Sequence, residues 1–151
     1  MGKGILGTQI VTQIGFIVKD VDTTKKKFAE FLGVEEPNAF WTDGIDKTQS
    51  EFNGKPCQAK ARLAFFKVGD TLDIELIQPD EHPSVWRNFL EEKGEGVHHI
   101  AFQIKGMKEK VSLLDKAGMT LIQKGEYTGG RYAYIDSLGD LKVLLELLEN
   151  D

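Results

Sequence analysis

Cysteine is nearly absent from this sequence, whose 151 residues include only Cys57. A single thiol cannot form an internal disulfide, so the composition gives no indication of an oxidising compartment. Long apolar runs are also absent, since no stretch approaches the ~18 residues of a membrane-spanning helix. The amino-terminal MGKGILGTQIV lacks the long apolar stretch and small-residue cleavage site of a signal peptide. We therefore expect a cytoplasmic protein that does not insert into a membrane.

The sequence has no excess of positive charge. Its 19 lysines and arginines are outnumbered by 24 acidic residues, which gives a formal net charge of −5 at pH 7. Proteins that bind nucleic acids usually concentrate basic residues on one face. The one basic run, from Lys25 to Lys27, is interpreted as the solvated face of a helix. We expect no nucleic-acid partner.

The composition is that of an ordinary folded domain. Apolar residues make up 40 % of the chain and charged residues 28 %, both near the averages of globular proteins. A chain of this length can bury roughly 70 % of the surface that its unfolded form exposes, so a sizeable core can form. We expect a single domain over residues 1–151.

Hydropathy and turn residues predict the same order of elements twice. In the first half, a strand in TQIGFIVKD precedes an amphipathic helix over residues 21–33, with Asp22 as the expected N-cap. A hairpin then turns at Gly69-Asp70, and a second short helix covers about residues 84–93. The elements of the second half, a strand, a helix, a strand and a hairpin, lie in VHHIAFQIKG, MKEKVSLLDKAGM, TLIQKG and RYAYIDSLGDLKVLLELLE.

The second half is a diverged copy of the first. Sliding the sequence by 86 residues places HIAFQIK on QIGFIVK, and sliding it by 71 places VLLELLEN on LDIELIQP. Two strand–helix–strands units therefore account for almost the whole chain, over about residues 9–79 and 95–149. The extra length of the first unit falls in residues 39–57, which we interpret as an extended loop with a functional or mobile role.

Alternation along the strands predicts which side chains can meet. Successive side chains of a strand point to opposite faces, so Gln13 and His99, at equivalent points of the repeat, face the concave side of the sheet. Glu75 and Glu146 are likewise equivalent to each other. Glu146 lies among leucines, where a carboxylate is costly unless a cation compensates it. His98 points to the other side and is expected to have no partner.

A divalent metal ion could supply that positive charge. One imidazole, two carboxylates and one amide oxygen, each from a separate strand, form four N/O ligands and leave positions for water or substrate. The predicted site consists of Gln13, Glu75, His99 and Glu146. The metal stays open among Zn, Ni, Co, Mn and Mg, because oxygen-rich sites accept several metals.

Several motifs resemble those of the vicinal oxygen chelate superfamily, the group of glyoxalases, bleomycin resistance proteins and methylmalonyl-CoA epimerases. They are QIGFIVKDVDTTKKKFAEFLG, VGDTLDIELIQP, GEGVHHIAFQI and the closing LLEL, and the resemblance covers about residues 9–149. It implies an α+β fold in which two tandem βαβββ modules form a curved mixed sheet around a concave cavity for metal and substrate. The same four ligands follow by position, and a homodimer is implied because relatives often form dimers.

The resemblance also implies a metal-dependent lyase or isomerase. Such an enzyme removes a proton α to a metal-bound carbonyl of a small-molecule substrate, through an enolate or enediolate. Glu146 is the implied ligand and base, and Glu75 a ligand and candidate second base. The ligand order Gln, Glu, His, Glu is similar to eukaryotic-type glyoxalase I. Residues 58–61, QAKA, stand where methylmalonyl-CoA epimerases usually carry a Glu-x-Gly-Val-like stretch. The alternative is a metal-free protein that sequesters a small molecule, as bleomycin-resistance-type relatives do.

Two residues outside the ligand set are candidates for substrate binding. Arg131 follows two glycines and could hold an anionic group, although a surface ion pair explains it equally well. Trp41 lies in the long predicted loop and could line a pocket. Tyr132, Tyr134 and Trp86 are interpreted as core or wall residues.

Overall fold

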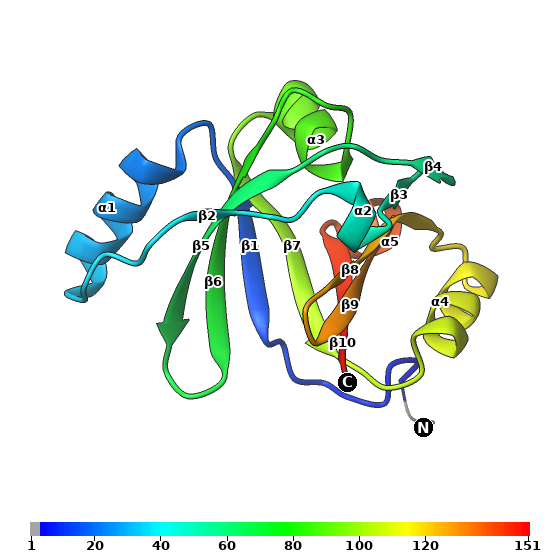
Figure 1. Cartoon of the computed structure of the whole chain (residues 1–151). Coiled ribbons are helices and arrows are strands. Elements are labelled where there is room, and N and C mark those ends of the chain that lie inside the picture. The colour runs from blue at the N-terminus through cyan, green and yellow to red at the C-terminus, as the bar shows by residue number, and fades with distance from the viewer. Residues whose placement is uncertain (1–3) are drawn as a thin grey trace.

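The computed structural model describes residues 4–151, which form one curled sheet with helices on its outer side (Figure 1). Residues 1–3, where the segment assessed for a signal peptide begins, lie outside the described part. The strands pair in the order β2-β5-β6-β1-β7-β10-β9-β8-β3-β4. This arrangement confirms the predicted α+β fold with a curved mixed sheet. Within residues 4–151, no helix has both the length and the apolar character needed to cross a bilayer.

Each module consists of a strand, a helix and three further strands. The first contains β1 (Gln13–Ile17), α1 (Val21–Leu32), β2 (Phe40–Trp41), β5 (Ala61–Val68) and β6 (Leu72–Pro79). The second contains β7 (Gly96–Gln103), α4 (Met107–Lys116), β8 (Leu121–Tyr127), β9 (Gly130–Ile135) and β10 (Leu144–Asn150). Helix α3 (Val85–Lys93) joins the modules, and the short α5 (Leu138–Leu141) connects β9 to β10.

The strand pairing follows the sequence repeat. In each module the first strand runs parallel to the last, β1 beside β6 and β7 beside β10. The modules meet where β1 and β7 run antiparallel, with Ile14 opposite Ile100, its equivalent in the repeat. The four strands that carry the predicted ligands are therefore neighbours at the centre of the sheet.

The segment over residues 39–57 has more structure than the predicted loop. It contains β2, α2 (Ile45–Thr48), β3 (Glu51–Phe52) and β4 (Lys55–Pro56). β2 pairs with β5 near one end of the sheet and β3 pairs with β8 near the other, so the segment spans the open side of the curve (Figure 1). The sequence pattern missed these elements because strands of two residues are too short to show a period.

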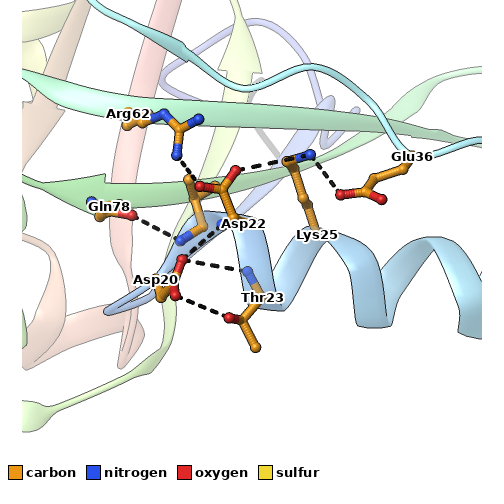
Figure 2. Close-up of polar contacts among 8 residues, drawn as sticks. Asp20, Asp22, Thr23, Lys25, Glu36, Arg62 and Gln78 are labelled. Atoms are coloured by element: carbon orange, nitrogen blue, oxygen red, sulfur yellow. Dashed lines mark hydrogen bonds and ion pairs between the residues drawn. The ribbon is translucent and has the colours of Figure 1, made fainter.

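Polar contacts at the first turn of α1 anchor this helix to the sheet (Figure 2). Asp20, which has an extended backbone, accepts hydrogen bonds from the N–H groups of Asp22 and Thr23. The N-cap is therefore Asp20, and the prediction of Asp22 was wrong. Asp22 already lies within the helix and pairs with Arg62 of β5. The predicted end at Gly33 is confirmed, since this residue has φ 71°, a conformation that favours glycine.

Three groups of buried side chains form the core. Helix α1 packs on β5 and β6 through residues such as Val21 and Leu76, and α4 packs on the second module through Leu114 and others. The third group lies under α3, around Trp86, and joins both modules. Burying each large aliphatic side chain contributes roughly 1.5–3 kcal/mol, so apolar packing holds the central strands in place from their outer side.

Candidate functional site

Four buried polar side chains converge within one chain on the inner face of the sheet. They come from the four central strands: Gln13 from β1, Glu75 from β6, His99 from β7 and Glu146 from β10. At most 7 % of any of these residues is exposed. The strand register explains the convergence, because Gly15 lies opposite both Glu75 and His99.

The distances in this cluster are those of direct contacts. Nε2 of His99 lies 2.9 Å from Oε2 of Glu146 and 3.5 Å from Oε1 of Glu75. It also lies 2.8 Å from Oε1 of Gln13. One potential ligand atom from each of the two glutamates and the histidine lies within 4.8 Å of the others. The structure therefore brings together all four residues that the strand parity selected.

The Gln13 amide can face the cluster in two ways. With Oε1 turned inward, it adds a fourth lone-pair atom to two carboxylates and an imidazole, which is the donor set that a divalent cation requires. With Nε2 turned inward, the amide donates to Oε2 of Glu146 over 2.8 Å and to Oε1 of Glu75 over 3.3 Å. The residues therefore fit a metal ion, and without one the amide can offset part of the excess of acceptors.

Burial shifts the pKa values of the charged members of the cluster. It raises the pKa of Glu146 from its ordinary 4.5 to about 8. Burial, with the nearby carboxylates of Glu146 and Asp73, raises the pKa of Glu75 well above its usual range. Burial lowers the pKa of His99 to about 3. Without a cation, the glutamates therefore hold protons near neutral pH while the imidazole is uncharged.

His98, which we expected to have no partner, is fully buried and makes two hydrogen-bond contacts. Its Nε2 lies 3.2 Å from the carbonyl oxygen of Val85, and its Nδ1 lies 2.9 Å from Nδ1 of His99. The prediction was wrong because the pairing of β1 with β7 shifts its register between Gly15 and Phe16. An irregularity of this kind breaks the strict alternation that the prediction assumed.

The contacts of His98 determine which nitrogen of His99 carries the proton. A carbonyl oxygen only accepts hydrogen bonds, so His98 donates through Nε2 to Val85. Burial lowers the pKa of His98 well below its usual value, which keeps the ring neutral and makes its Nδ1 an acceptor. His99 then donates through Nδ1 and presents a lone pair on Nε2 to the cluster. A histidine oriented in this way by a second hydrogen bond is the usual form of a metal ligand.

Gly15 leaves the space that the His99 ring occupies. A Cβ atom at position 15 would overlap Cε1, Nδ1 and Nε2 of that ring. Since the overlap involves a fully buried side chain held at both nitrogens, the ring cannot move aside without losing its contacts. Glycine is therefore required here by the close approach of the imidazole rather than by the backbone conformation.

Two aromatic residues support the cluster from the wall. Nε1 of Trp86 donates to the hydroxyl of Tyr134 over 3.1 Å, and the Tyr134 ring packs edge-on against His99 with centroids 5.2 Å apart. The hydroxyl of Tyr134 also hydrogen-bonds to Glu146, which partly counters the rise of its pKa. These positions agree with the interpretation of Tyr134 and Trp86 as core or wall residues.

A cavity of about 520 Å³ opens over the cluster. Gln13, Glu75 and Glu146 form part of its lining, and the segment over residues 39–57 contributes Trp41 and other residues to its wall. Trp41 is about half exposed, so its ring is available to a ligand. The volume of the cavity lies within the range of ordinary small-molecule sites.

Arg131 does not lie at this cavity. Its guanidinium group contacts the carboxylates of Glu126, Glu149 and Asp151 at 3.4, 3.1 and 2.5 Å. It lines a different hollow, beside α4. Of the two readings that the sequence left open for this residue, the structure therefore shows the ion pair.

Comparisons with known proteins agree with this geometry. The sequence model of the Glyoxalase/Bleomycin resistance protein/Dioxygenase superfamily matches residues 12–134. The uncharacterized protein YqjC of Bacillus subtilis strain 168 is 35 % identical over 95 residues, 61 % of this chain and 67 % of that protein. A 2-epi-5-epi-valiolone epimerase of Actinomyces sp is 26 % identical over 106 residues, 68 % of this chain. The latter match spans 56 % of the epimerase, little more than half its length.

Solved structures show the same fold. A methylmalonyl-CoA epimerase from Mycobacterium tuberculosis superposes with a TM-score of 0.67 over 100 % of this chain and 93 % of that one, at 21 % identity. The fold, the module pairing and the family match over most of the chain lead to one assignment. This protein belongs to the vicinal oxygen chelate superfamily, the group of glyoxalases, bleomycin resistance proteins and dioxygenases.

Proposed function

We propose that this protein is a divalent-metal-dependent epimerase or isomerase that moves the proton α to a carbonyl group. Gln13, Glu75, His99 and Glu146 would hold the metal. The observation that supports this best is the buried convergence of one imidazole nitrogen and two carboxylates within 4.8 Å of one another. Folding buries two acids side by side at a considerable cost, which a cation bound between them would offset.

Each residue has a role that follows from its chemistry. A divalent ion bound here would polarise the substrate carbonyl and so make the neighbouring C–H bond more acidic. Glu146 is the proposed base, because a carboxylate beside the metal can accept the α-proton when it loosens its coordination. Glu75, on the neighbouring side of the cluster, is the proposed second base, which returns a proton to the other face of the carbon. Gln13 and His99 orient the site without changing charge.

The comparisons support the class of reaction. Relatives include an epimerase of a valiolone and epimerases of methylmalonyl-CoA, two reactions named for a change at one stereocentre. A glyoxalase-type lyase, the other expectation from the ligand order, would begin with the same removal of an α-proton. Candidate substrates are therefore cyclic hydroxyketones, 2-methyl thioesters and hemithioacetals.

The second candidate is sequestration of a small molecule without metal or chemistry. The superfamily name includes bleomycin resistance proteins, and the cavity alone is compatible with binding. The two facing acids favour catalysis, because a metal-free binder gains nothing from burying Glu75 and Glu146 together. The four residues come from one chain, so the proposed homodimer need not share ligands between its subunits.

Proton exchange with solvent tests the proposal. Metal-loaded protein is incubated in D₂O with each candidate substrate, and proton NMR follows the α-proton signal. We expect one substrate to lose its signal, and Glu146→Gln to abolish that loss while the circular dichroism spectrum stays unchanged. Glu91→Gln, which affects only an exposed pair with Arg87 on α3, is the matched control. Undiminished exchange in Glu146→Gln would exclude Glu146 as the base. Metal analysis that finds no bound ion under replete conditions would favour sequestration.

A further inference from the structure

We infer that the substrate of this site is an uncharged, hydroxylated carbonyl compound. This inference rests on the proposed function and narrows its substrate class. It comes from the charges that line the cavity, from the charge of the ligand set and from the character of the walls. It separates the candidate substrates, since some are neutral and others carry a carboxylate or phosphates.

The charged side chains of the cavity lining are acidic. The acidic residues of its lining are Asp43, Asp73, Glu75, Glu126 and Glu146. Among the described residues, no lysine or arginine lines it. A carboxylate or phosphate inside the cavity would therefore meet the carboxylates of Asp43, Asp73 and Glu126 and no cationic side chain of the lining. Desolvating an anion without such a partner is strongly unfavourable.

Two of these acids contact cations that lie outside the cavity lining. Lys67 contacts Asp73 at 3.0 Å, and its side chain is 78 % exposed. Arg131 contacts Glu126 at 3.4 Å and is shared with two further carboxylates. Neither cation is available to a substrate, because each would have to leave its partner and enter the cavity.

The ligand set leaves no positive charge for an anionic substrate. Gln13 and His99 are neutral ligands, whereas Glu75 and Glu146 contribute one negative charge each when they bind a cation. Together they balance a divalent ion, so the loaded site is neutral before substrate enters. A carboxylate that joined this site would make it negative inside an acidic cavity, whereas a hydroxyl or ketone oxygen would not.

The walls suit a molecule with both hydroxyl groups and C–H faces. Phe40 and Trp41 are half exposed and lie on β2, and Phe40 stacks on Phe65 with centroids 6.0 Å apart. Flat aromatic surfaces of this kind pack against the C–H groups of a ligand. Thr42 and Thr128 add hydroxyl groups to the lining, which can exchange hydrogen bonds with a polyhydroxylated compound.

A pair of small ligands tests the charge preference directly. Acetoin and lactate have the same number of non-hydrogen atoms and two vicinal oxygens, but only lactate is charged. In water, divalent ions bind lactate more tightly than acetoin. If the metal-loaded protein binds acetoin more tightly than lactate, the preference for the uncharged ligand comes from the protein. Each ligand is titrated into the Co²⁺-substituted protein and followed by the visible spectrum of cobalt and by tryptophan fluorescence. We expect acetoin to bind about tenfold more tightly or better, given the cost of burying an unpaired charge.

A charge variant with a matched control identifies the origin of the preference. Asp43→Lys places a cation in the cavity lining, whereas Asp46→Lys makes the same change at an exposed residue of the same segment outside the lining. We expect Asp43→Lys to bind lactate several-fold more tightly than the unmodified protein does, and Asp46→Lys to leave its affinity unchanged. Equal effects of both variants would show that the lining does not set the selectivity.

Binding and catalysis can fail separately in these experiments. Lactate bound as tightly as acetoin, or no binding of either ligand up to its solubility limit, would overturn the inference. Exchange of the α-proton of an anionic thioester alone would also overturn it while the proposed function survives. Selective binding of acetoin with no exchange of any candidate substrate would leave the inference standing and refute the proposed catalysis.

Discussion

Replacing Glu146 by glutamine should have opposite effects on stability with and without metal. The pKa of this carboxyl rises from 4.5 to about 8 on folding because it is buried. Because the pKa of the carboxyl is raised, Glu146 contributes its full stabilisation below pH 4.5, and this stabilisation is lost as the pH rises towards 8. In the metal-free protein Glu146 therefore destabilises the fold near neutral pH, whereas in the loaded protein it is a proposed metal ligand that would stabilise it.

The magnitude follows from the shift in pKa. Between pH 4.5 and 7 the Glu146 carboxyl ionises in the unfolded chain but stays protonated in the folded one. Each pH unit in this range costs about 1.4 kcal/mol, so the free energy of unfolding is lowered by roughly 3 kcal/mol at pH 7. Glutamine does not ionise in the unfolded chain and so avoids this loss, but the substitution removes a hydrogen bond worth about 1 kcal/mol. We expect metal-free Glu146→Gln to be about 2 kcal/mol more stable at pH 7. This corresponds to a rise in Tm of roughly 4–8 °C for a chain of this size.

The free energy of unfolding of the unmodified, metal-free protein should depend on pH in a way that reveals the raised pKa of Glu146. His99 acts in the opposite direction, because its pKa falls from 6.5 to about 3 on folding, so stability is lost as the pH falls through that range. The two effects offset each other between pH 4.5 and 6.5. From pH 6.5 to 8 only the effect of the glutamates remains, and Glu146 alone should lower the free energy of unfolding by about 2 kcal/mol over this range.

Thermal and denaturant unfolding, followed by circular dichroism, measure these effects in EDTA and at saturating Zn²⁺. In EDTA, Glu146→Gln should unfold at a higher temperature than the unmodified protein, and at saturating metal the order should reverse. The control Glu91→Gln should stay within about 0.5 kcal/mol of the unmodified protein in both conditions. A variant less stable than the unmodified protein in EDTA, together with a flat profile from pH 6.5 to 8, would refute the electrostatic reasoning.

Three further substitutions test other parts of the site. His98→Phe removes the acceptor of the His99 N–H and should lower zinc affinity about 10–100-fold by calorimetry; unchanged affinity would show that the tautomer is set elsewhere. Gly15→Ala should prevent the His99 ring from occupying its position, so metal binding should be lost and the free energy of unfolding should fall by about 1–3 kcal/mol. Trp41→Ala should raise KM for the identified substrate while the free energy of unfolding changes by less than about 0.5 kcal/mol, and an unchanged KM would place the substrate away from β2.

The four cluster residues could be predicted because each depends on a regular feature. Strand parity selects the face on which a side chain lies. The repeat then shows that Gln13 is equivalent to His99 and Glu75 to Glu146, and this step requires no knowledge of the turns between the strands. The structure brings these residues into contact through β1, β6, β7 and β10. Residues that lie on long, periodic strands are therefore within reach of sequence reasoning.

The features that could not be predicted depend on contacts between distant segments. The role of His98 requires the shift of register beside Gly15 and the carbonyl of Val85 on α3, neither of which has a periodic signal. The pairing of β2 and β3 with opposite ends of the sheet depends on edges that form only in the folded chain. The N-cap was misplaced by two residues because Asp20 and Asp22 are both suitable side chains, and only the backbone distinguishes them.

The four cluster residues and the segment that spans the open side of the sheet belong to different parts of the fold. The cluster residues lie on central strands, each with a neighbour on both sides, and His99 is held further by His98 and by the space at Gly15. Part of the cavity wall, by contrast, belongs to the segment over residues 39–57, whose strands β2, β3 and β4 have two residues each. Changes in that segment can therefore alter the shape and charge of the cavity while the cluster stays intact. Under the proposed function, this division would let one cluster geometry serve different carbonyl substrates, with selectivity at residues such as Trp41 and Asp43.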